Sequence, residues 1–126
     1  MGKIISVANP KGGVGKTITS INLAAALAYL NQKVLLIDLD PKADASKGIG
    51  IDTSSVEYNV YSIMIQNQNI RKAIMRTSYP NLDVISSFKS ILFPSSKYIL
   101  LYDKYSNSYG VLITYGLFLD PSPLLY

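Results

Sequence analysis

The sequence predicts an α/β protein whose mostly parallel sheet is flanked by helices. Two short apolar runs, residues 3–8 (KIISVA) and 33–39 (KVLLIDL), have strand length and are rich in branched aliphatic residues, as is typical of strands covered on both faces. Between them lie a glycine-rich stretch and then residues 16–30, where alanine and leucine dominate and favour a helix. Strand, loop, helix and strand in this order make one βαβ unit with a right-handed crossover.

Beyond residue 41 the expected elements are shorter. We expect a loop over residues 42–55, because polar and small residues follow Asp-Pro there. Short helices are expected over residues 56–65 and 69–76, and further strands over residues 82–86 (LDVIS) and 111–119. The chain therefore predicts about four strands in all.

The composition of the chain changes after Phe88. Six of the ten tyrosines follow Phe88, and four of them recur at spacings of 4, 3 and 4, which is the spacing of one helix face. We expect a helix that lays this stripe on the sheet, in preference to a platform on which nucleic-acid bases stack. The four tyrosines are Tyr98, Tyr102, Tyr105 and Tyr109. Neither a repeat nor a linker divides residues 1–126.

Composition excludes several kinds of chemistry. The 126 residues contain no cysteine and no histidine, which rules out disulfides, thiolate or imidazole metal sites, cysteine nucleophiles and a Ser-His triad. A mean hydropathy of +0.21 argues for a packed core. The net charge of +4 is a weak bias toward anionic partners. With no secretory signal and no apolar run of membrane-spanning length, we expect a cytoplasmic protein.

Residues 9–17 (NPKGGVGKT) carry the chemistry that remains. They lie between a strand and the first turn of a helix, where glycines let main-chain N–H groups converge and the helix N-terminus adds partial positive charge, so the loop suits a polyphosphate. Lys16 would reach the β- and γ-phosphates, and the Thr17 hydroxyl would ligate Mg²⁺. The alternative is a glycine-rich turn that carries surface lysines.

These residues resemble a known motif. Pro10 occupies the place of the first glycine of the general phosphate-binding pattern, whereas residues 11–17 (KGGVGKT) closely resemble the deviant Walker A motif of the ParA/MinD family of P-loop ATPases. The nearest similarity is to the partition ParA (Soj-like) branch. Residues 34–41 (VLLIDLDP) look like the second motif of the same family. The resemblance implies a P-loop NTPase fold with ATP and Mg²⁺ as cofactors.

The resemblance also implies roles in the first motif. Lys16 would bind the phosphates of its own ATP, and Lys11 would reach across an ATP-sandwiched homodimer to the partner's nucleotide. Gly12 would be small because the partner's backbone approaches it closely. Ile18 stands where the family commonly has a second threonine and would offer only its main-chain N–H. The expected nucleotide-binding residues are Lys11, Gly12, Gly13, Val14, Gly15, Lys16, Thr17 and Ile18.

In the second motif, Asp40 would orient or activate the attacking water, and Asp38 would sit beside the magnesium shell. The expected catalytic set is therefore Lys11, Lys16 and Asp40. Taken without the neighbouring loop, the two carboxylates would also fit an ordinary turn at a strand end. Lys42 replaces the glutamine that usually follows Asp-Pro in the family.

A third motif of the family, the Walker B aspartate that holds Mg²⁺ through water, has two candidates. Asp120 follows the apolar run 111–119 and precedes a proline, whereas Asp103 interrupts the tyrosine stripe. We favour Asp120, so the expected metal residues are Thr17, Asp38 and Asp120. An ordinary turn explains Asp120 about equally well.

The resemblance implies an ATP-hydrolysing partition protein that acts in plasmid or chromosome segregation. Its expected partners are a second copy of the chain, a centromere-binding protein and non-specific DNA, and no membrane association is expected. Its expected localisation is the cytoplasm or the nucleoid. ParA-like ATPases continue for about as many residues again beyond residue 126, and residues 88–126 diverge from them. The alternative is therefore a truncated nucleotide-binding or inert regulatory fragment without turnover.

Other readings of the same motif are weaker. A MinD-like membrane ATPase lacks support, because no C-terminal amphipathic helix with a basic face is present. A nitrogenase-type iron protein is excluded by the absence of cysteine. A bacterial tyrosine kinase would carry its tyrosines in a C-terminal tail, whereas most tyrosines here precede the run 111–119.

Overall fold

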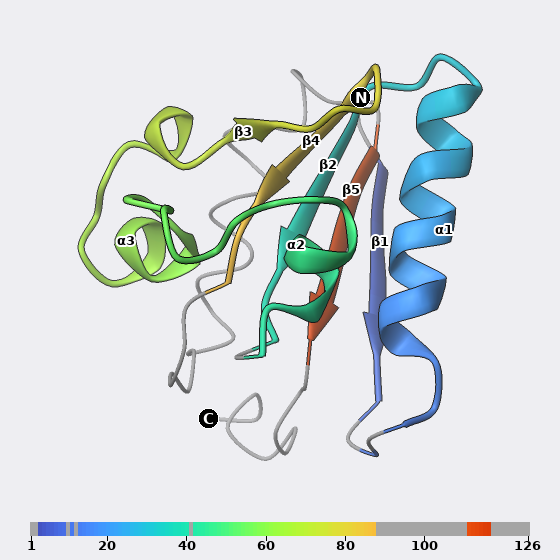
Figure 1. Cartoon of the computed structure of the whole chain (residues 1–126), viewed down its shortest axis with the longest axis horizontal. Helices are drawn as coiled ribbons and strands as arrows, with labels where there is room; N and C mark the ends of the chain where they lie inside the picture. Colours follow the sequence, from blue (N-terminus) through green and yellow to red (C-terminus); the bar gives the residue numbers. More distant parts are fainter. Residues whose placement is uncertain (1–2, 10, 12, 41, 88–110, 117–126) are drawn as a thin grey trace.

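A computed structural model describes residues 3–9, 11, 13–40, 42–87 and 111–116. Within them, five strands form one sheet in the order β1-β5-β2-β4-β3 (Figure 1). Four strands, β1, β5, β2 and β4, run parallel, and β3 pairs antiparallel with β4. The strands are β1 (Lys3–Ala8), β2 (Val34–Asp38), β3 (Met75–Arg76), β4 (Leu82–Ile85) and β5 (Val111–Gly116).

The βαβ unit predicted from the sequence is confirmed. Helix α1 (Lys16–Tyr29) connects β1 to β2, and β5 lies between these two strands and pairs with both. Their carboxyl ends meet at one edge of the sheet, where Ala8 lies opposite Gly116 and Asp38 lies opposite Tyr115. In parallel sheets this edge is where ligands bind.

Strand β2 is the centre of the hydrophobic core, and all five of its residues are buried. Its side chains alternate between two clusters, as the two-residue period of a strand requires. Val34 and Leu36 pack in a cluster with Ala24 and Ala28 of α1. Leu35 and Ile37 pack on the other face, in the cluster that contains Val60 and Met64 of α3 (Val60–Met64). Helices therefore pack on both faces of the sheet at β2.

Three expectations about the middle of the chain are wrong in part. The expected loop 42–55 contains a one-turn helix, α2 (Asp44–Gly48). The expected helix 56–65 shortens to α3, whose N-terminus is set by a capping box at Asn59. The expected helix 69–76 is a 3₁₀ turn, η1 (Ile70–Lys72), followed by β3, because pairing with β4 draws those residues into the sheet. The sheet consequently has five described strands, not four.

Strand β1 also departs from expectation. Its residues are exposed or half-buried, and Ile4 is 44% exposed. The reason is position, since in the described part of the chain β1 pairs with β5 alone and forms one edge of the sheet. The tyrosine stripe at 98–109, Asp103, Asp120 and residues 117–119 of the expected last strand lie outside the described residues.

Candidate functional site

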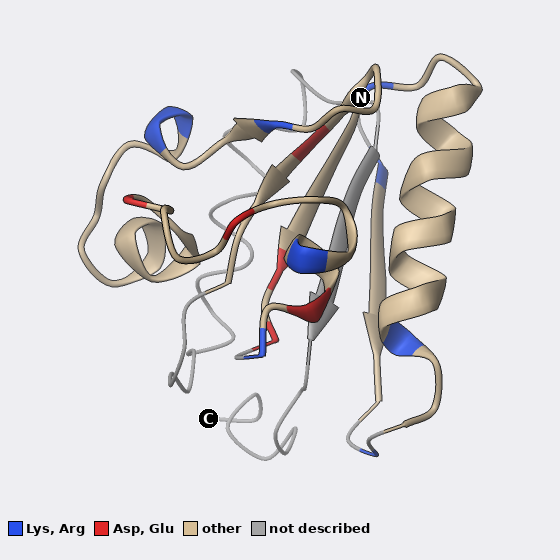
Figure 2. Ribbon diagram, in the orientation of Figure 1, with Lys and Arg blue, Asp and Glu red and all other residues tan. Residues whose placement is uncertain are grey.

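The motif residues meet at the carboxyl edge of the sheet. The loop after β1 leads into the first turn of α1, and Asp38 and Asp40 follow the neighbouring end of β2. Basic and acidic positions gather at this lower edge, as Figure 2 shows at the start of α1 and after β2. The fold therefore brings the two predicted motifs to one place.

The glycines of the loop shape its backbone. Gly13 and Gly15 have φ angles of 70° and 93°, in the left-handed region that favours glycine. Gly15 is also the N-cap of α1, which has no side-chain cap and no acidic residue in its first turn. In the described part of the chain, no side chain caps this helix N-terminus, and its partial positive charge suits an anion.

Lys16 is buried at the start of this helix, with 9% of its surface exposed. Its ammonium Nζ donates a 2.8 Å hydrogen bond to the main-chain carbonyl of Lys11. A carbonyl leaves the ammonium with its full positive charge, whereas a carboxylate would neutralise it. Lys16 therefore supplies an unneutralised charge beside the helix N-terminus, where it adds to the helix dipole.

The other loop residues differ in exposure. Lys11 is exposed, and its N–H donates to the side-chain oxygen Oδ1 of Asn9 at 2.9 Å, which holds the start of the loop. Val14 and Ile18 are exposed, and Thr17 is half-buried. Ile18 is 59% exposed, so an apolar side chain stands at the surface of the first helical turn. Gly12, with Pro10, lies outside the described residues.

Asp38 is fully buried at the end of β2, and hydrogen bonds engage both of its oxygens. Oδ1 accepts a bond from the N–H of Asp40 at 3.1 Å. Oδ2 accepts two bonds from Ser46 of α2, one from the main-chain N–H at 2.9 Å and one from the hydroxyl at 2.7 Å. The carboxylate thus ties the end of β2 to a helix eight residues further along.

Asp40 is also buried, and its Oδ1 accepts a bond from the N–H of Lys42 at 3.0 Å. This contact uses the main chain of Lys42, so it does not depend on which side chain stands at position 42. Among the described residues, no three His, Cys, Asp or Glu side chains are close enough to hold a metal ion by themselves. A divalent cation at this edge would therefore need oxygens beyond those that the described residues supply.

Sequence reasoning missed Ser46, the residue that bonds Asp38 twice. It lies in a segment expected to be a loop, and no motif includes it. A serine a few residues after a strand-terminal aspartate is a weak signal, because such pairs are common in turns. The signal appears only in the folded chain, where helix α2 places both the N–H and the hydroxyl of Ser46 against Asp38.

Burial of Asp38 predicts a pH dependence of stability. Burial raises the pKa of this carboxyl from 3.8 to about 6, although hydrogen bonds from Ser46 and Asp40 lower it. Between these two pH values the folded chain binds more protons at Asp38 than the unfolded chain does. The free energy of unfolding should therefore fall as the pH rises through this window, by on the order of 3 kcal/mol from this residue.

Chemical unfolding of wild type and Asp38→Asn between about pH 4 and 7 measures this contribution, because the variant lacks the titrating group. The difference in unfolding free energy between the two proteins should change with pH in the stated direction. Asp52→Asn is the matched control, since Asp52 is exposed and its hydrogen bonds from Ser54 lower its pKa. A pH-independent difference between wild type and Asp38→Asn would contradict the prediction.

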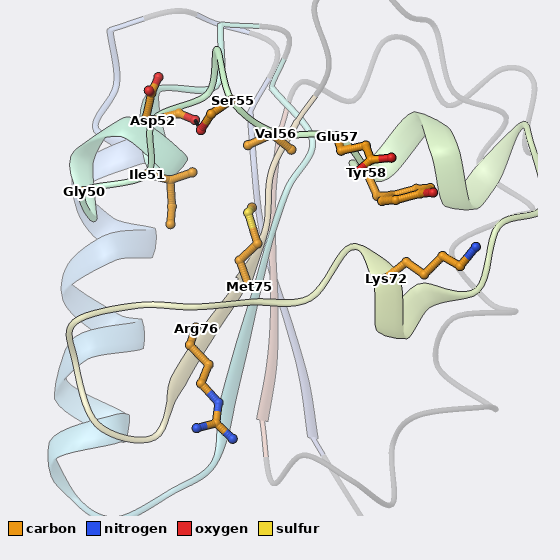
Figure 3. A pocket seen from close by; sticks show the side chains of 10 residues that line it. All are labelled: Gly50, Ile51, Asp52, Ser55, Val56, Glu57, Tyr58, Lys72, Met75 and Arg76. Atoms are coloured by element: carbon orange, nitrogen blue, oxygen red, sulfur yellow. Dashed lines mark hydrogen bonds between the residues drawn. The ribbon is translucent and has the colours of Figure 1, made fainter.

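A hollow of about 630 Å³ lies away from the residues of the two motifs. It lies between the segment 50–58 and the η1–β3 segment, and its lining includes Ile51, Val56 and Met75 (Figure 3). Lys72 reaches the ring of Tyr58 there, with Nζ 5.2 Å from the ring centre. None of the described residues of the loop 9–17 lines it, and neither does Asp38 or Asp40, so the described residues of the motif site lie outside it.

Comparison with known proteins identifies the family of this chain. The AAA domain family matches residues 2–105 of this chain. The sporulation initiation inhibitor protein Soj of Bacillus subtilis is 51% identical over 85 residues, which cover 68% of this chain and 34% of Soj. The chain thus spans about a third of the length of this relative.

Two solved structures have the same fold. A putative plasmid partition protein from Borrelia burgdorferi bound to AMPPNP is 31% identical, with a TM-score of 0.66, and the match covers 93% of this chain and 53% of that one. Cobyrinic acid a,c-diamide synthase from Mycobacterium smegmatis, bound to an ATP analogue and magnesium, is 25% identical, with a TM-score of 0.79 over 93% and 52% of the two chains. Among the described residues, no helix has the length and apolar character to cross a membrane. The chain belongs to the ParA/MinD family of P-loop ATPases, within the AAA domain family that matches most of its length.

Proposed function

We propose that this chain binds ATP at the loop 9–17 and hydrolyses it in a nucleotide-dependent homodimer. The observation that carries the proposal is Lys16, a buried ammonium that a neutral carbonyl holds at an uncapped helix N-terminus. An ATP phosphate would replace that carbonyl as the acceptor and would gain a charge-assisted hydrogen bond. The structures bound to nucleotide analogues add support, because they share this fold.

The loop would hold the phosphates chiefly through its main chain. Residues 12–18 would supply the N–H groups, and Gly13 and Gly15 have the backbone conformation that such a cradle uses. The side chain of Ile18 is exposed and has no hydrogen-bond donor. The main-chain N–H of Ile18 would therefore be the group that bonds to the nucleotide.

Magnesium would be held jointly by protein and nucleotide. Thr17 would ligate it from the first turn of α1, and Asp38 and Asp120 would stand beside its water shell. The donor set fits, since Mg²⁺ takes one or two protein oxygens together with phosphate oxygens. Because hydrogen bonds engage both Asp38 oxygens, we infer that Asp38 acts through water. When bound, the ion would neutralise phosphate charge.

Hydrolysis would depend on Lys11 and Asp40. Lys11 is exposed, which suits a cation that reaches a nucleotide on a second copy of the chain. Asp40 would orient the attacking water with the carboxylate that Lys42 N–H already holds. Phosphoryl transfer needs positioning and positive charge more than covalent chemistry, which agrees with a chain that has no Cys or His.

In the cell we propose a role in plasmid or chromosome partition. The similarity to Soj and to a plasmid partition protein supports it. The partners would be a centromere-binding protein and non-specific DNA, and the net charge of +4 is compatible with the latter.

A second candidate is a chain that binds nucleotide without turnover. The observation that favours it is the edge position of β1, which pairs on one side only in the described part of the chain. An exposed strand edge tends to pair with other chains, and this strand leads directly into the loop.

Titration of the purified protein with a fluorescent ATP analogue and Mg²⁺, with phosphate release recorded on the same samples, tests both candidates. Saturable binding with turnover is the expected result. Binding without phosphate release would favour the second candidate. A folded, soluble protein that does not bind would contradict both.

A further inference from the structure

The Asp38 carboxylate has a second partner residue that no motif includes. Ser46 donates to it through both its N–H and its hydroxyl, and neither Asp38 nor Ser46 exposes any surface to solvent. With the bond from Asp40 N–H, three donors converge on one buried carboxylate. This cluster closes the turn between β2 and α2.

The cluster fixes the main chain that carries Asp40. Its N–H is held by Asp38, and its carbonyl accepts a bond from Ala43 N–H at 2.8 Å. Ala43 has a φ of 54°, a left-handed conformation that is strained for an alanine. The turn keeps this strained residue because bonds on both sides of it hold the chain, including those of Ser46 to Asp38.

We propose that Ser46 is a positioning residue for ATP hydrolysis. It holds the Asp38 carboxylate, and Asp38 in turn fixes the backbone of Asp40. The inference rests on the proposed function, because it assumes that Asp40 orients the attacking water. Ser46 itself touches no reacting atom.

The hydroxyl is the part of Ser46 that substitution can remove. In Ser46→Ala the main-chain bond to Oδ2 persists, but the buried carboxylate loses its shortest donor. An underbonded buried carboxylate adjusts its position to regain partners, and the bond to Asp40 N–H moves with it. Displacing a water-orienting group lowers the rate of chemistry far more than it weakens binding.

The test measures phosphate release and ATP-analogue affinity for Ser46→Ala in the whole chain. We expect the turnover number to fall about tenfold, by analogy with the loss of partners that orient active-site ligands, while the affinity stays close to that of wild type. Ser54→Ala is the matched control, because the Ser54 hydroxyl makes the same kind of bond to Asp52 at 2.6 Å but on the surface. It should leave both quantities unchanged.

Two results would overturn the inference. One is an unchanged turnover number in a folded Ser46→Ala protein, and the other is a parallel loss of affinity and turnover, which a general structural defect would cause. If wild type itself shows no Lys16-dependent turnover, then the proposed function fails instead, and the two failures are distinguishable.

A measurement on wild type alone covers the case in which Ser46→Ala does not fold. The N–H groups of Asp40 and Ser46 should exchange with solvent deuterium far more slowly than that of Ser54, which donates to Asp52 Oδ1 at the surface. Equal exchange rates would mean that the cluster does not hold the turn, and the inference would be wrong.

Discussion

Replacing Lys16 by alanine is expected to lower the affinity for ATP by roughly a hundredfold, since a hydrogen bond to a charged group contributes up to about 3 kcal/mol. The ammonium is already in place at the helix N-terminus, and binding requires only that it exchange the Lys11 carbonyl for a phosphate oxygen. Alanine removes both the charge and the donor. Titration with a fluorescent ATP analogue in the presence of Mg²⁺ measures the change.

Lys33→Ala is the matched control for Lys16→Ala. Lys33 is exposed and directly precedes β2, at the opposite end of that strand from Asp38. Replacing Lys33 changes the net charge by the same amount as replacing Lys16, but it removes no charge from the loop 9–17. The affinity for ATP should therefore stay at the wild-type value. Equal affinities of Lys16→Ala and wild type would mean that the nucleotide does not bind at this loop.

The sequence predicted the strands and the helix that build the site. The apolar runs and the alanine-rich segment give the bounds of β1, α1, β2 and β4 within about two residues, because an apolar run of strand length and a run of helix-forming residues are clear patterns in a sequence. The sequence did not predict α2 or β3. A five-residue helix completes barely one turn, and a two-residue strand exists only through its pairing with β4, so neither leaves a periodic pattern in the chain.

The site, like the fold, was predictable from the sequence in part. The spacing of the first motif indicated Lys16 and its glycines, because a phosphate cradle requires those residue types in that order. Two contacts were not predictable, the bond from Lys16 to the Lys11 carbonyl and the bonds from Ser46 to Asp38. Both depend on how a turn folds back in space, which local spacing does not encode.

Lys11→Ala and Asp40→Asn are expected to spare ATP binding and to remove turnover. Lys11→Ala keeps the main-chain carbonyl that holds Lys16, and Asp40→Asn keeps an oxygen for Lys42 N–H. Turnover should fall by about a thousandfold without the lysine, by analogy with arginine fingers, and by at least about a hundredfold without the carboxylate. Phosphate release and analogue affinity, measured on the same samples, separate the two effects. Loss of binding in these variants equal to that in Lys16→Ala would contradict the assigned roles.

A mixture of the two variants tests whether Lys11 acts on the partner's nucleotide. In a mixed dimer, the Lys11→Ala protomer binds ATP beside its own Asp40 and receives Lys11 from the Asp40→Asn protomer, so that one of the two sites is complete. Half of the dimers in an equal mixture are mixed, so turnover should recover to about a quarter of the wild-type value if the dimer is symmetric. If Lys11 instead acts on the nucleotide of its own protomer, no site in the mixture is complete and turnover stays at the level of the separate variants.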